Sequence, residues 1–120
     1  MSIITLCGST KFTDEMLIKQ WELTKAGHIV LTWCVLPNSY FEKVICGNGD
    51  HAHLGDQENV KEIIDAVHKK KIDLSDEILV INVDDYIGES TKSEVLHALK
   101  AGKIVRFLHP HEKRDWEALK

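Results

Sequence analysis

Short apolar runs alternate with amphipathic segments along most of this sequence. Apolar or β-branched runs, typical of buried strands, occupy Ile3 to Cys7, His28 to Leu36, Glu77 to Val83 and Lys103 to Leu108. The segments between them have helical periodicity. Because strands that alternate with helices form right-handed βαβ units, the sequence predicts an α/β fold with a parallel sheet of four to five strands.

Helical periodicity also sets the expected helix positions and buried faces. Helices are predicted at about Thr13–Lys25, Asp56–Lys71 and Thr91–Ala101, with a short last helix at Glu112–Leu119. The expected buried positions are Leu17, Trp21 and Thr24 on the first helix, and Val60, Ile63, Ile64 and Val67 on the second. The segment from Pro37 to Gly55 is longer than an ordinary connection, which is typical of a lid or a mobile loop.

The composition is that of a globular protein. The chain has 120 residues, of which 43% are hydrophobic and 28% charged, which suits a single domain over residues 1–120. The net charge is −4 and no basic stripe is interleaved with aromatics, so nucleic acid is not an expected partner. No apolar run approaches the roughly 20 residues of a membrane span, and strand-like sequence begins at Ser2 without room for a signal peptide. Cys7, Cys34 and Cys46 form no C-x-x-C pair, so we expect reduced thiols and a cytoplasmic location.

The strongest functional signal follows the third predicted strand. A polar turn with Gly88 comes after this strand, and hydroxyl and acidic residues, including Ser90 and Glu94, then open a helix. Ligands of open α/β sheets bind at the carboxyl ends of the strands. Glu94, expected in the first helical turn, is therefore a candidate nucleophile for an electrophilic carbon such as a sugar C1′. The alternative is a capping box, in which Glu94 only bonds to the backbone N–H of Thr91.

Two other short patterns suggest groups that act on a substrate. Gly8-Ser9-Thr10-Lys11 ends the first strand and can bind a phosphate, although it has neither P-loop nor dinucleotide-binding spacing; the alternative is an ordinary tight turn. Asp65 and His68 are three residues apart on the second helix, so they share a face. His68 is expected to titrate near neutrality and to protonate a leaving group, with Asp65 raising its pKa. The alternative is a solvated helix face.

Carboxylates also flank the third predicted strand. Asp76 precedes the strand and either faces the ligand crevice or closes the turn, and we favour the turn. Asp85 follows the strand on the crevice side and is a candidate for binding sugar hydroxyls, with Tyr86 stacking on a base. His51 and His53 lack a third ligand at a suitable spacing, as do His109 and His111, so no metal and no cofactor is expected.

Three motifs together resemble the nucleoside 2-deoxyribosyltransferase superfamily, which includes the deoxynucleoside 5′-monophosphate N-glycosidases. They are Leu6-Cys7-Gly8-Ser9, Ser75-Asp76-Glu77-Ile78 and the segment Gly88 to Glu94, and the similarity covers about residues 3–108. It implies a flavodoxin-like or Rossmann-like three-layer sandwich without a cofactor. It also implies that Glu94 attacks C1′ of a 2-deoxyribosyl substrate and releases the base, and that Cys7, Gly8 and Ser9 contact the sugar or phosphate.

Two positions depart from the family pattern. His68 stands where the family has an Asp, eight residues before Asp76, and Gly88 stands where it has an Asp or Ser, six residues before the nucleophile. A His can still donate a proton to a departing base.

We therefore expect cleavage of the N-glycosidic bond of a (deoxy)nucleoside or its 5′-monophosphate, by hydrolysis or base exchange. Glu94 is the expected nucleophile, assisted by His68 and Asp65. The expected substrate-binding residues are Cys7, Gly8, Ser9, Lys11, Asp76, Asp85, Gly88 and Ser90. The resemblance further implies a homodimer or higher oligomer, with Trp33 and Trp116 either at the interface or in the core. The alternative function is a non-catalytic nucleotide-binding module in which Glu94 only caps its helix.

Overall fold

The computed structural model describes residues 1–35 and 60–109. Its strands are β1 (Ile3–Gly8), β2 (Ile29–Leu31), β3 (Glu77–Ile81) and β4 (Ile104–Phe107). Its α-helices are α1 (Thr13–Lys25), α4 (Lys61–Leu74) and α5 (Glu89–Lys100), and short 3-10 helices are η1 (Thr10–Phe12) and η4 (Val83–Asp85). The predicted lid, the predicted last helix and Trp116 lie outside the described residues.

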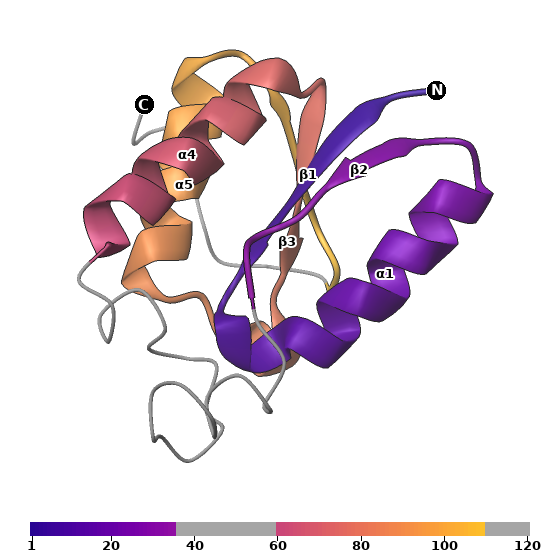
Figure 1. Cartoon of the computed structure of the whole chain (residues 1–120), viewed down its shortest axis with the longest axis horizontal. Helices are drawn as coiled ribbons and strands as arrows, with labels where there is room; N and C mark the ends of the chain where they lie inside the picture. Colours follow the sequence, from indigo (N-terminus) through magenta and orange to yellow (C-terminus); the bar gives the residue numbers. More distant parts are fainter. Residues whose placement is uncertain (36–59, 110–120) are drawn as a thin grey trace.

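The four strands form one parallel sheet in the order β2-β1-β3-β4. Helix α1 covers one face of the sheet, and α4 and α5 cover the other (Figure 1). The predicted α/β sandwich with a parallel sheet is therefore confirmed. Because the chain leaves β1 in one direction and returns to β3 on its other side, the strand order reverses between β1 and β3. The carboxyl ends of these two strands are where such folds bind ligands.

The period-2 alternation of strand side chains divides the core between the two faces. Ile4 and Leu6 of β1 pack with Met16 of α1, together with Trp33, Leu79 and Ile81. Cys7, the residue after Leu6, packs on the opposite face, in a cluster formed with Ile72, Ile78, Val80, Ile87, Val95, Ala98 and Leu99. Cys7 thus belongs to the α4/α5 layer because of its place in the alternation.

The predictions of which faces of α1 and α4 are buried are wrong. Leu17 and Trp21 of α1 are 48% and 63% exposed, and the helix buries Thr13 and Met16 instead. Ile63 and Val67 of α4 are 63% and 47% exposed. The buried residues of α4 are His68 and Ile72.

The error on α4 has a physical reason. Its sheet-facing line follows the i, i+4 spacing of Ile64, His68 and Ile72, and a polar residue occupies the middle of this line. A search for apolar periodicity therefore selects the neighbouring face.

Trp33, 8% exposed, belongs to the core, which excludes it from a surface interface. Within the two described segments, no helix has the length and apolar character needed to cross a membrane.

Candidate active site

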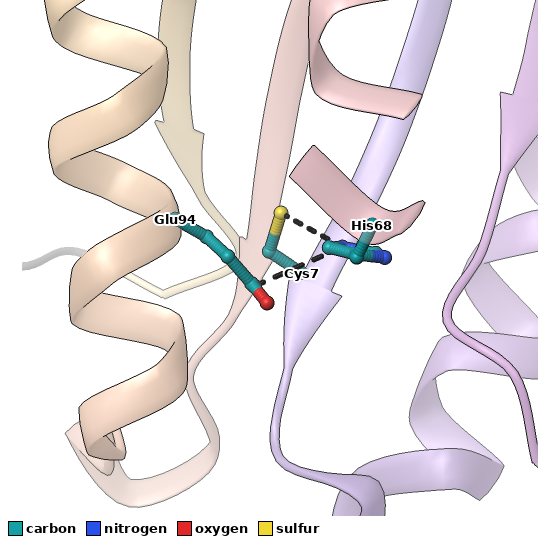
Figure 2. A group of neighbouring side chains, drawn as sticks. All are labelled: Cys7, His68 and Glu94. Carbon is teal, nitrogen blue, oxygen red and sulfur yellow. Dashed lines mark hydrogen bonds and ion pairs between the residues drawn. The ribbon is translucent and has the colours of Figure 1, made fainter. Parts of the chain in front are cut away.

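Three buried side chains from three different elements meet near the carboxyl end of β1 (Figure 2). Nε2 of His68 lies 3.5 Å from Sγ of Cys7 and 3.7 Å from Oε1 of Glu94. Cys7 is 0% exposed, His68 5% and Glu94 8%. The sequence analysis selected all three residues separately, and the fold brings them together from β1, α4 and α5.

Helix α5 gives Glu94 a position that the sequence analysis did not anticipate. The helix begins at Glu89 after an extended Gly88, which makes Glu94 its sixth residue. A capping box needs the Glu at the third position, so the capping alternative is wrong. The early start also corrects the expected placement of Glu94 in the first turn. Its carboxyl group, one turn further along, points into the protein beside Cys7 and His68 (Figure 2).

Burial controls the protonation of all three groups. Burial, together with the negative charge of Asp65, raises the pKa of Glu94 to about 8. Burial lowers the pKa of His68 to about 4, with Lys71 acting in the same direction. Burial, together with Glu94, also raises the pKa of the Cys7 thiol well above its usual value. At neutral pH the site therefore holds a thiol, a neutral imidazole and a neutral carboxyl group, and His68 and Glu94 do not form a salt bridge.

The predicted titration of His68 near neutrality is accordingly wrong. Asp65 does raise the pKa of His68, as expected, but burial has the larger and opposite effect. The solvated-face alternative is also wrong for His68, which is buried. Asp65 itself is partly exposed and accepts a hydrogen bond from Nζ of Lys61 at 3.0 Å.

Lys61 joins the two helices that carry the site. Besides Asp65, its Nζ donates to Oγ of Ser90 at 3.1 Å, which links α4 to the first turn of α5. Ser90 is therefore held beside the site, and its hydroxyl group already accepts a hydrogen bond from Lys61. Lys61 was not selected from the sequence, although its i, i+4 spacing to Asp65 was an available signal.

The segment after β1 lies at the same end of the sheet. Gly8 ends the strand in a close approach, since a Cβ there would lie 3.1 Å from the Ile81 carbonyl oxygen and from the Trp33 ring. Oγ of Ser9 accepts from the Lys11 backbone N–H at 3.3 Å and caps η1. Nζ of Lys11 lies 4.0 Å from the centre of the Tyr86 ring, which connects this segment to the loop after β3.

The loop after β3 contains an unusual backbone. Asp84 and Asp85 have φ values of 52° and 57°, a left-handed conformation that is uncommon outside glycine. Asn82, fully buried, supports this loop: its Nδ2 donates to Oδ1 of Asp85 at 3.3 Å and to the His109 carbonyl at 3.0 Å. Asp85 thus lies on the expected side of the sheet. The sequence analysis missed Asn82, whose signal was a polar residue directly after an apolar run.

Gly88 and Asp76 occupy different ends of the sheet. Gly88 lies beside Tyr86, whose hydroxyl would be 3.3 Å from a Cβ at this position. Asp76 lies at the opposite end, where its carboxylate and backbone N–H bond to the N–H and carbonyl of Ile3, each at 2.8 Å. The turn role of Asp76 therefore applies, and the structure separates it from the other candidate substrate-binding residues.

The free energy of unfolding should depend on pH, because Glu94 keeps its proton in the folded state at pH values where it loses it in the unfolded state. Between pH 4.5 and 6.5 the folded state holds an extra proton on Glu94 and the unfolded state one on His68, so the two effects cancel. From pH 6.5 to 8 only the difference at Glu94 remains, and the folded state holds the extra proton. We expect the free energy of unfolding to fall by about 2 kcal/mol over this interval.

Urea denaturation at pH 6.5 and at pH 8 measures this fall in the free energy of unfolding. A chelator is added to keep metal ions out of the site. Glu94→Gln should lack the contribution, so its unfolding free energy should decline less than that of the wild type by about 2 kcal/mol. The contribution of the other histidines is the same in both proteins, so it cancels when the two declines in unfolding free energy are subtracted. Equal declines in both proteins would contradict a raised pKa for Glu94.

The site combines a carboxyl group, an imidazole and a thiol in surroundings that largely exclude water. One chemistry open to it is nucleophilic attack by Glu94 with a proton supplied through His68. Another is the binding of a cation, because the potential ligand atoms of Cys7, His68 and Glu94 all lie within 4.8 Å of one another. Comparison of the chain with protein-family models, with curated proteins and with solved structures gave no match.

Proposed function

We propose that the protein cleaves the N-glycosidic bond of a 2-deoxynucleoside or its 5′-monophosphate, with Glu94 as the nucleophile. The main support is the buried contact of 3.7 Å between Oε1 of Glu94 and Nε2 of His68. This pair lies near the carboxyl end of β1, on the face covered by α4 and α5 (Figure 2). The sequence resemblance supplies the substrate class, and the pair supplies an acid and a nucleophile for the same bond.

The proposed reaction uses the one proton that the pair holds between pH about 4 and about 8. The proton moves from Glu94 to Nε2 of His68, which produces a carboxylate and an imidazolium. The carboxylate forms a bond to C1′ while the bond from C1′ to the base nitrogen breaks. His68 donates the proton to the departing base and becomes neutral again. Water or a second base then attacks C1′, the bond from C1′ to the Glu94 oxygen breaks, and the proton lost by the attacking group returns to the Glu94–His68 pair.

Developing charge on the sugar favours this proton transfer. The transition state of glycosidic cleavage resembles an oxocarbenium ion, and positive charge close to Glu94 stabilises its ionised form. The same burial that keeps Glu94 neutral in the free protein strengthens this attraction, because little water screens it. Asp65 also favours the protonated state of His68.

The groups at the ends of β1 and β3 can bind the rest of such a substrate. The Lys11 ammonium and the Ser9 hydroxyl are suited to a 5′-phosphate, and the Asp85 carboxylate is suited to a sugar hydroxyl. Tyr86 is 45% exposed and packs edge-on against Phe12, with ring centres 5.9 Å apart. Its remaining surface offers an aromatic face to a base.

A panel of deoxynucleosides and their 5′-monophosphates tests the proposal. Each is incubated with chelator-treated protein, and free base is measured by chromatography. Release that depends on protein concentration is expected for at least one member. Binding detected by calorimetry without base release would instead identify the alternative function, a nucleotide-binding module.

We further infer that the protein forms a homo-oligomer through α4. Ile63, Val67 and Leu74 are 63%, 47% and 70% exposed, and their spacing places them on one side of the helix. An apolar stripe of this kind commonly marks an interface. Light scattering during size-exclusion chromatography measures the mass of the assembly. The cytoplasmic location stays a prediction.

A further inference from the structure

The three buried side chains of the site are donors of three different kinds. Cys7 offers a sulfur, His68 a nitrogen and Glu94 an oxygen, all within 4.8 Å of one another. Zinc bonds of about 2.0–2.3 Å in a tetrahedral site place neighbouring donor atoms about 3.3–3.6 Å apart. The separations here are 3.5 Å from Sγ of Cys7 to Nε2 of His68 and 3.7 Å from this nitrogen to Oε1 of Glu94. Two edges of a zinc tetrahedron are therefore nearly in place.

We propose that Cys7, His68 and Glu94 bind Zn²⁺ and leave its fourth coordination position open. The mixture of sulfur, nitrogen and oxygen suits zinc, whereas Ca²⁺ and Mg²⁺ take oxygen ligands. Three protein ligands with one open position is the arrangement of catalytic rather than structural zinc sites. The proposal rests on the three donor atoms and is independent of the reaction proposed above.

Charge balance favours zinc in this buried position. Zn²⁺ bound by a thiolate, a carboxylate and a neutral imidazole forms a group without net charge, because the two negative ligands balance the two charges of the ion. Binding therefore leaves no unbalanced charge in the buried site.

Each of the three donors is carried by a regular element of the fold. Cys7 lies near the end of β1, His68 lies in the sheet-facing line of α4, and Glu94 lies in the second turn of α5. Nδ1 of His68 is buried and has no hydrogen-bond partner among the described residues. Nε2 has polar contacts with Cys7 and Glu94, and a metal ion at this nitrogen would hold the ring more firmly.

The test measures the metal directly. The full-length protein is stripped with a chelator, incubated with Zn²⁺, desalted and analysed by mass spectrometry for zinc. We expect one zinc ion per chain. Co²⁺ in place of Zn²⁺ should give a thiolate-to-cobalt charge-transfer band and the visible absorption of a tetrahedral ion, because Cys7 is a ligand. Calorimetry in buffers of different ionisation enthalpy should show that binding releases protons, because the Cys7 sulfur binds zinc as a thiolate.

Matched variants assign the ligands. Cys7→Ser, His68→Gln and Glu94→Gln should each weaken zinc binding more than about 100-fold, and Cys7→Ser should also remove the charge-transfer band. Cys34→Ser and His97→Gln change an exposed cysteine and a partly exposed histidine, and both should bind zinc like the wild type. A variant with Cys46, His51 and His53 replaced should do the same. Circular dichroism without metal establishes that each variant is folded.

Two results would overturn the proposal. One is a folded wild type that retains no stoichiometric zinc. The other is zinc binding that survives in Cys7→Ser and His68→Gln, since the metal would then have other ligands. Base release is assayed separately with the chelator present, so the zinc site and the proposed reaction can fail independently. If both hold, zinc should inhibit base release, because it occupies the Glu94 oxygen and the His68 nitrogen that the reaction needs.

Discussion

Glu94→Gln is expected to lower the rate of base release at least about 1,000-fold while leaving the protein folded. An amide cannot form the glycosyl ester, so the covalent step is lost. The fold should tolerate the change, because Gln has nearly the shape of the protonated carboxyl group that burial favours at this position. Single-turnover rates from quenched samples, with circular dichroism and thermal unfolding of the same preparations, measure both effects.

Glu89→Gln is the matched control for this prediction. The Glu89 side chain is 91% exposed in the first turn of the same helix, so its replacement should leave base release near the wild-type rate. If Glu94→Gln keeps more than about a tenth of the wild-type rate, Glu94 is not the nucleophile. If the wild type itself releases no base, the proposed function fails regardless of the variants.

His68→Gln should lower base release by about 100- to 10,000-fold for natural bases, the usual contribution of a general acid. The loss should be much smaller for a 2-deoxyribosyl substrate whose leaving group is stable as an anion, because such a group departs without a proton. A purely structural role of His68 would affect both substrates equally. The ratio of the two losses is therefore the informative measurement.

His97→Gln is the control for His68, because His97 is a partly exposed histidine bonded to Asp73 at 2.7 Å. The wild-type rate should be nearly constant between pH about 4 and about 8 and should fall above this range, as the Glu94–His68 pair loses its shared proton. His68→Gln should lose this dependence with the activated substrate. Equal losses for the two kinds of substrate would contradict the role of His68 as the acid.

The sheet was predictable because its strands are signalled locally. The run from Ile78 to Ile81 is buried on both faces of a parallel sheet, so its continuous apolar character predicts a central strand. The helix faces were not predictable in the same way. Which side of α1 and α4 is buried depends on packing against the sheet, and Leu17 and Ile63 have the same apolar character as truly buried residues.

The candidate site could be predicted only in part. Cys7 was selected through a motif resemblance, and Glu94 was first selected through its place after the third predicted strand. Local sequence also allowed a capping role for Glu94, because Thr91 resembles an N-cap better than Gly88 does. The pKa of His68 was misjudged because the sequence shows its neighbour Asp65 and does not show its burial. The three donors meet through contacts between residues that are 61 and 26 positions apart in the sequence, and no local pattern contains such contacts.

The close packing of Trp33 against Gly8 provides an optical reporter within the protein. The indole ring lies in the core directly next to the residue that follows Cys7, whereas Trp21 is mostly exposed on α1. Indole emission depends on the polarity and rigidity of its surroundings, so we expect the emission of Trp33 to change when the end of β1 changes. A chain in which Phe replaces Trp21 and Trp116 would emit from Trp33 alone. Occupancy of the site could then be followed by fluorescence, without a label and without turnover.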